Sequence, residues 1–107
     1  MKPRIVLTTV GGDFDPRPIA RELVLRRLAA CVNVLPAVTS IYRWQGRVEE
    51  DGEQLLIIKT ADHRIEELRD VLLALHPYEV PEFVVVEIDA IEGPYRQWLM
   101  TAVEAEA

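Results

Sequence analysis

The sequence contains a single cysteine, Cys31, and only two histidines. One cysteine excludes an internal disulfide and a cysteine-rich zinc site, and an unpaired cysteine favours a reducing compartment. The chain also lacks a run of the roughly 20 apolar residues that a membrane-spanning helix needs, and its N-terminus does not resemble a signal peptide. We therefore predict a cytoplasmic protein that does not bind a membrane.

Basic residues are scarce as well. The chain carries 12 lysines and arginines against 18 aspartates and glutamates, which gives a net charge of −6. Nucleic acids and anionic membranes are bound by basic surfaces, so this composition argues against both and favours cations as ligands. Hydrophobic residues make up 50% of the chain, and no linker or low-complexity tract divides it. We predict one domain over residues 1–107.

Hydrophobic patterning predicts the order β-α-β-β-α-β followed by a C-terminal helix. The first strand reads as buried on both faces, and the second helix as burying a stripe that runs from Ile65 through Leu68 and Leu72 to Leu75. Asp13 or Asp15 is expected to cap the first helix, and Asp62 the second. The predicted strands are residues 4–10, 31–44, 47–60 and 83–88, and the third helix begins near Pro94.

Two β-α-β units joined by a hairpin predict an α+β fold, the ferredoxin-like sandwich, with both helices on one face of the sheet. The hairpin over residues 31–60 is far longer than two ordinary strands of about 5–6 residues. Pro36 implies a bulge or an edge. The aromatic end of the hairpin either folds back on its own sheet or packs against other copies in a closed ring, and we favour the ring.

The stretch "HPYEVPE", residues 76–82, is the main candidate for ligand chemistry. Its prolines predict that the second helix ends near Leu75 and that the stretch is extended. His76 and Glu82 would then lie about 20 Å apart, so another segment or subunit must complete any metal site. His76 is the strongest candidate ligand, since imidazole binds copper and zinc, and Glu79 and Glu82 are weaker ones. Alternatively, His76 caps the helix or hydrogen-bonds across an interface.

Other polar residues receive plainer interpretations. Lys59 ends an apolar strand and needs a carboxylate partner, for which we expect Glu49, Glu50 or Glu82 of another subunit. The run "EEDGE", residues 49–53, is expected to be a solvated acidic loop, and Cys31 a small buried side chain. A phosphate site in "GGDFDPR" is disfavoured by Asp13 and Asp15, so we predict no enzymatic activity.

Several motifs resemble the CutA family of divalent-ion tolerance proteins. These are "RLAACVNVLPAVTSIYRWQGRVEED", "LLIIKT", "LHPYEVPE" and "YRQWL", and the likeness covers nearly the whole chain in order. The resemblance implies a ferredoxin-like subunit in a tight homotrimer, hairpins packed between subunits, and a cytosolic role in tolerance to divalent metals, copper above all. It also implies similarity to PII signalling proteins and no assigned reaction. We expect interface positions at Tyr42, Trp44, Lys59, Tyr78 and Trp98.

The copper site implied by the resemblance is only partly present in this chain. Some copper-binding members use a cysteine in the first strand and a His-His pair before "PY", whereas Thr8, Thr9 and Leu75 stand at these positions and His76 alone matches. Copper(II) or another divalent cation remains the expected ligand, and no metal is expected to be needed for folding. The alternative is a PII-like trimer that binds a small ligand or a protein partner and has no metal role.

Overall fold

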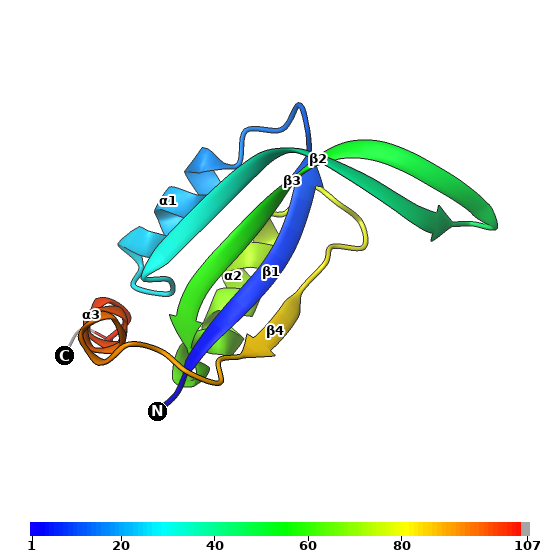
Figure 1. Ribbon diagram of the computed structural model, residues 1–107. Helices are drawn as coiled ribbons and strands as arrows, with labels where there is room; N and C mark the ends of the chain where they lie inside the picture. The colour runs from blue at the N-terminus through cyan, green and yellow to red at the C-terminus, as the bar shows by residue number, and fades with distance from the viewer. Residues whose placement is uncertain (106–107) are drawn as a thin grey trace.

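The computed structural model describes residues 1–105 and confirms an α+β fold. Figure 1 shows a sheet, two helices stacked against it and a hairpin that extends well beyond it. The strands are β1 (Pro3–Gly11), β2 (Cys31–Trp44), β3 (Arg47–Ala61) and β4 (Val84–Glu87). The helices are α1 (Arg17–Leu25), α2 (Ile65–Leu75), which a 3-10 turn over Asp62–Arg64 precedes, and α3 (Gly93–Ala102).

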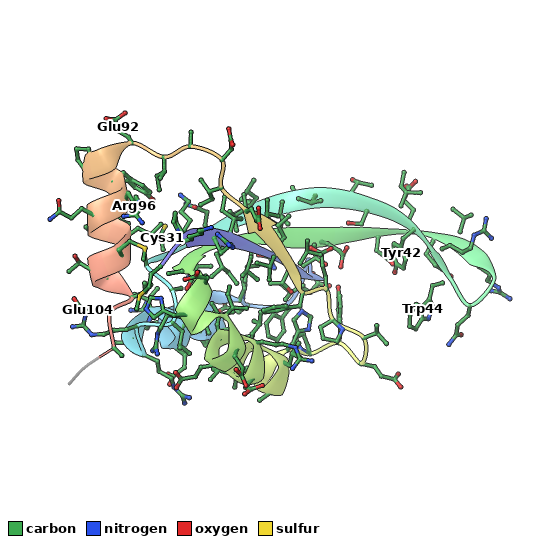
Figure 2. All side chains as sticks on the ribbon, turned by 90° about the horizontal axis from the view of Figure 1, so that it is seen from below. Cys31, Tyr42, Trp44, Glu92, Arg96 and Glu104 are labelled. Atoms are coloured by element: carbon green, nitrogen blue, oxygen red, sulfur yellow. The ribbon has the colours of Figure 1, made fainter. Side chains whose placement is uncertain are left out.

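The four strands form one antiparallel sheet in the order β2-β3-β1-β4. Side chains alternate along β1, so Val6, Thr8 and Val10 are buried while Ile5 and Leu7 are only half-buried. The prediction that this strand is buried on both faces is therefore not met within the single chain. Its apolar run is continuous, but α1 and α2 cover only one face of the sheet (Figure 2).

The core lies between that face and the two helices. Leu23 of α1 and Leu68 and Leu72 of α2 are almost fully buried against Leu56 and Ile58 of β3. The third helix is placed differently, because it packs across one end of the sheet (Figure 1). There it forms a second, smaller cluster, whose buried members are Ala30, Ala61, Leu99 and Val103.

The ends of the helices correct two predictions. Leu75 is 44% exposed and does not extend the buried stripe of α2, because the helix ends there and the chain turns away. Asp62 does not cap α2; its carboxylate lies in the 3-10 turn and accepts hydrogen bonds from the backbone N–H groups of Lys2 and His63. Asp15 meets the expectation only in part: the N-cap position of α1 is Pro16, and the Asp15 carboxylate, one residue earlier, accepts a hydrogen bond from the N–H of Arg17, the first residue of the helix.

The hairpin of β2 and β3 projects from the sheet and gives the molecule a long axis of 46 Å. Its turn has positive φ at Gln45 and Gly46, as a two-residue type I′ turn requires. The predicted bulge is confirmed, since the register of β2 shifts between Leu35 and Val38, around Pro36. The hairpin does not fold back on its own sheet, because Ile41 is 66% exposed and Trp44 is 43% exposed.

The face of the sheet opposite α1 and α2 is apolar. Residues directly paired across antiparallel strands share a face, and the register pairs Leu7 with Ile57 and with Val84. All of these side chains are half-buried or exposed. We call the apolar part of this surface the apolar sheet face, which consists of Ile5, Leu7, Leu55, Ile57, Val84 and Val86; Thr9 and Lys59 lie on the same face at its two ends.

Candidate functional site

A groove of about 540 Å³ lies between the hairpin and the chain that links α2 to β4. Tyr42 and Trp44 contribute to it from the hairpin, where Figure 2 labels both side chains on the projecting half. Three carboxylates line the groove, and no lysine, arginine or histidine does. Its lining residues are Thr9, Ser40, Tyr42, Trp44, Glu53, Pro77, Tyr78, Glu79, Val80 and Glu82.

His76 anchors the segment that forms the outer wall of this groove. Its Nδ1 accepts a hydrogen bond from the backbone N–H of Tyr78 at 3.0 Å, so Nε2 carries the proton and donates to the carbonyl of Thr9 at 2.9 Å. The residue is 9% exposed, and burial lowers the pKa of its imidazole, although the Thr9 carbonyl and Glu53 oppose this shift. The ring is therefore a neutral bridge between β1 and residue 78.

This bridge changes two sequence-based interpretations. The helix ends at Leu75 as predicted, but the following segment is bent at Pro77, Glu79 and Val80 instead of running fully extended. The imidazole accepts a hydrogen bond from a backbone group two residues ahead, and this contact requires a bend. His76 lies at the C-terminal end of α2, yet its side chain bonds to Thr9 of β1 and not to the helix.

The His76 bridge predicts a pH effect on stability. The folded-state pKa lies below the ordinary value of 6.5, so the unfolded chain binds the proton more readily. The contribution of neutral His76 to the free energy of unfolding should be fully present above pH 6.5. It should fall as the pH drops towards the folded-state pKa, with a slope of at most about 1.4 kcal/mol per pH unit. Denaturant melts between pH 8 and pH 4.5, at one protein concentration, measure this slope.

The matched controls for the pH effect are His76→Gln and His63→Gln. His76→Gln removes the titrating group and should flatten the slope, whereas His63→Gln replaces the exposed histidine of the 3-10 turn and should preserve it. Asp15 and Asp62 also have lowered pKa values, but all three proteins share these carboxyls, so they do not account for a difference between the slopes. Equal slopes in all three proteins would contradict the assignment.

Two tyrosine–carboxylate hydrogen bonds shape the inside of the groove. The Tyr78 hydroxyl donates to Glu53 at 2.7 Å, and the Tyr42 hydroxyl donates to Asp51. Burial, followed by the bond to Glu53, raises the pKa of Tyr78. The bond to Asp51 raises the pKa of Tyr42 to about 12. Both hydroxyls therefore stay protonated at neutral pH and hold their rings in place.

These bonds correct the interpretation of residues 49–53 as a solvated loop. The whole run lies within β3, and Glu53 is buried. Sequence reasoning thus missed Glu53 and Asp51. No local pattern in the sequence would have found them, because Tyr42 lies directly opposite Glu49 and reaches Asp51 diagonally, and Tyr78 reaches Glu53 across 25 residues of sequence.

The predicted site residues separate into two groups. Tyr42, Trp44 and Tyr78 line the groove together with Glu79 and Glu82. Trp98 lies on α3 instead, and Lys59 lies beside that helix. The ammonium of Lys59 is 5.8 Å from the centre of the Tyr95 ring, and the Tyr95 and Trp98 ring centres are 5.3 Å apart with the rings tilted by 42°. Within residues 1–105, Lys59 has an aromatic contact and no carboxylate partner. Cys31 is only half-buried, whereas we predicted a buried side chain.

A single chain does not offer a complete metal site. Across residues 1–105, the His, Cys, Asp and Glu side chains form no group of three that could hold an ion. Both nitrogens of His76 are already hydrogen-bonded. Glu79 and Glu82 are exposed on the groove wall, and within the described chain neither has an ion pair. The metal-ligand role of these three residues therefore remains a prediction that needs a second copy of the chain.

The architecture is that of a small α+β protein whose long hairpin reaches beyond its own sheet. The family model "CutA1 divalent ion tolerance protein" matches residues 4–102, and the chain belongs to this family. It is 50% identical over 95 residues to "Divalent-cation tolerance protein CutA" of Thermus thermophilus, a match that covers 89% of this chain and 92% of the relative. The predicted family is confirmed.

Solved structures agree with this assignment. The divalent cation tolerance protein of Thermus thermophilus superposes with a TM-score of 0.90 at 47% identity, covering 95% of this chain and 99% of that one. A protein named "PII-like protein CutA" from Nostoc superposes with a TM-score of 0.86 at 39% identity, covering 96% and 99%. Among the described residues, no helix is long and apolar enough to cross a membrane.

Proposed function

We propose that this protein is a ferredoxin-like subunit of a cytoplasmic homotrimer that contributes to divalent-cation tolerance and binds copper(II) or another divalent ion where subunits meet. The strand order β2-β3-β1-β4 supports the ferredoxin-like description. Family membership supports the tolerance role. We propose no catalysed reaction.

The observation that carries the proposal is the apolar sheet face, because it leaves half of the sheet without a covering layer. Sheets normally bury an apolar face against another layer, and exposed apolar patches mark interaction surfaces. The edge strand β2 and the projecting hairpin lie beside this face, and unpaired edges favour pairing with another chain. A closed ring of copies would cover both features.

Metal binding between subunits follows from the chemistry of the groove. Glu79 and Glu82 are unpaired carboxylates within the described chain, but they are too few to hold an ion alone. The two carboxylates of one copy, together with ligand atoms from the neighbouring copy, would complete the coordination of the ion. His76 could take part only by giving up the hydrogen bond from the N–H of Tyr78, so we assign the main role to the two glutamates.

Copper(II) titration of the assembled protein tests this assignment. We expect Glu79→Gln combined with Glu82→Gln to weaken copper binding at least tenfold, because amides replace two anionic ligands. Glu66→Gln combined with Glu104→Gln removes the same charge at exposed positions away from the groove and should leave the affinity unchanged. Equal affinity in wild type and both double variants would remove the groove glutamates from any copper site.

A second candidate function, a PII-like trimer that binds a small ligand, is favoured by a specific observation. The groove is aromatic as well as acidic, and its volume falls in the range of about 300–1,000 Å³ typical of small-molecule sites. A divalent ion needs neither aromatic rings nor such a volume.

A further inference from the structure

The projecting half of the hairpin begins at the bulge in β2. Two residues of β2, Pro36 and Ala37, stand there opposite the single residue Gln54 of β3. Ala37 has a φ of 61°, which lies in the left-handed region that residues with a Cβ seldom adopt. In bulges with a left-handed residue, that residue is usually glycine. The chain therefore holds a strained residue at the point where β2 gains one residue over β3.

At this level of the hairpin, β3 is fixed in place and β2 is not. The Nε2 of Gln54 donates to the carbonyls of Gly11 at 2.9 Å and Phe14 at 2.6 Å. The N–H of Gly12 donates to the carbonyl of Gly52 at 3.1 Å. In contrast, β2 is an edge strand that pairs only with β3. A slip between the two strands would therefore move β2.

The extra residue of β2 has a second possible place, which is the turn. In the observed register, Trp44 stands opposite Arg47. A regular ladder without the bulge would put Arg43 there, and the turn would then have three residues instead of two. Hairpin turns of three residues are nearly as common as turns of two. The two registers therefore differ only in whether the bulge or the turn contains one more residue.

A slip of one residue would turn every side chain in the projecting half of β2 to the opposite face. In the observed register, Tyr42 stands opposite Glu49, and its hydroxyl donates to Asp51 on the same face. In the slipped register, Tyr42 would stand opposite Val48 and point away from Asp51, and Ile41 would take its place. The location of the extra residue thus decides which face of the hairpin carries its aromatic side chains.

We propose that Ala37 is a positioning residue: its left-handed conformation keeps the extra residue in the bulge, and this register holds Tyr42 and Trp44 on one face of the hairpin. A strained residue persists where the surrounding structure requires its conformation. The turn supplies that requirement, because positive φ at both Gln45 and Gly46 forms the favoured two-residue turn.

Cross-linking of opposed cysteines distinguishes the two registers. Ser40 stands opposite Asp51, and directly opposed side chains are close enough for a disulfide, so Ser40→Cys with Asp51→Cys reports the observed register. In the slipped register, Ser40 would stand opposite Glu50, and Ser40→Cys with Glu50→Cys reports that arrangement. Both pairs are made together with Cys31→Ser, and their disulfide equilibria with glutathione are measured in the assembled protein.

Substitutions of Ala37 should change the two equilibria in opposite directions. Ala37→Val should lower disulfide formation by the 40/51 pair at least tenfold and raise that of the 40/50 pair, because a β-branched residue disfavours positive φ. Ala37→Asn adds a side chain of similar size that tolerates positive φ, so it should not lower the 40/51 equilibrium. Thr39→Val is the matched control, since residue 39 is also exposed and has no positive φ, and it should change neither equilibrium.

The proposal would be overturned if Ala37→Val left both equilibria unchanged. Ala37→Gly keeps the test decisive if the valine variant does not fold. Glycine adopts positive φ without strain, so we expect this variant to raise the 40/51 equilibrium at least twofold, and the absence of any gain would contradict the role of Ala37.

The consequence for assembly rests on the proposed function, since Tyr42 and Trp44 are predicted contacts between copies. Sedimentation of Ala37→Val separates the two ideas. A slipped register with unchanged assembly would support the role of Ala37 and count against these aromatic contacts. An unchanged register with lost assembly would overturn the role of Ala37 and leave the proposed function intact.

Discussion

Replacing Leu72 with alanine should destabilise the protein by about 2–5 kcal/mol, which is the usual range for a leucine removed from a closed core. Leu72 is 1% exposed and packs in the main core cluster. The lost side chain leaves a cavity among α1, α2 and β3 that rigid neighbours cannot fill. Chemical denaturation at one fixed protein concentration measures the change, because assembly makes stability depend on concentration.

Leu75→Ala is the matched control for this prediction. It removes the same atoms three residues later on the same helix, from a position that is 44% exposed in the single chain. We expect a change within about 0.5 kcal/mol when both leucine variants are measured at the same low protein concentration, which disfavours association. Equal losses for the two variants would mean that Leu75 packs into the core and that α2 continues beyond the observed end.

The contrast between these leucines illustrates what periodicity can predict. Helical spacing places Leu68, Leu72 and Leu75 on one stripe, and two of the three are buried. Leu75 is not buried because α2 ends at this residue, just before His76 and Pro77. Local signals of this kind gave the bulge at Pro36, the turn at Gln45 and Gly46 and the order of the elements, since each depends on neighbouring residues only.

The groove depends on contacts that local signals cannot supply. His76 bonds to Thr9 across 67 residues of sequence, and Tyr78 bonds to Glu53 across 25. Each contact requires the strand register and the bend after α2 to be known together. The sequence therefore pointed to residues 76–82, which border the groove, and to Tyr42 and Trp44, which line it, but assigned Glu53 to a solvated loop.

A charge placed on the apolar sheet face should abolish assembly. In Ile57→Asp, a carboxylate replaces an aliphatic side chain in the middle of this face, opposite Leu7. Burying it without a partner would cost several kcal/mol per subunit, and a symmetric ring repeats that cost at every copy. We expect sedimentation velocity to give a single species near the mass of one chain, 12.2 kDa, at concentrations where the proposed wild-type trimer is expected to be intact.

Two further variants show whether the apolar sheet face itself is responsible. Leu25→Asp adds the same charge at the end of α1, where the side chain is 71% exposed, and should leave assembly intact. Ile57→Ala keeps the face uncharged, so it should weaken assembly without abolishing it. This variant still tests the sheet face if Ile57→Asp does not fold. If Ile57→Asp remains folded by circular dichroism and still sediments as the wild type does, the sheet face is not the contact between subunits. Contacts between copies would then have to come from the hairpin and its exposed aromatic residues, such as Trp44 on the groove wall.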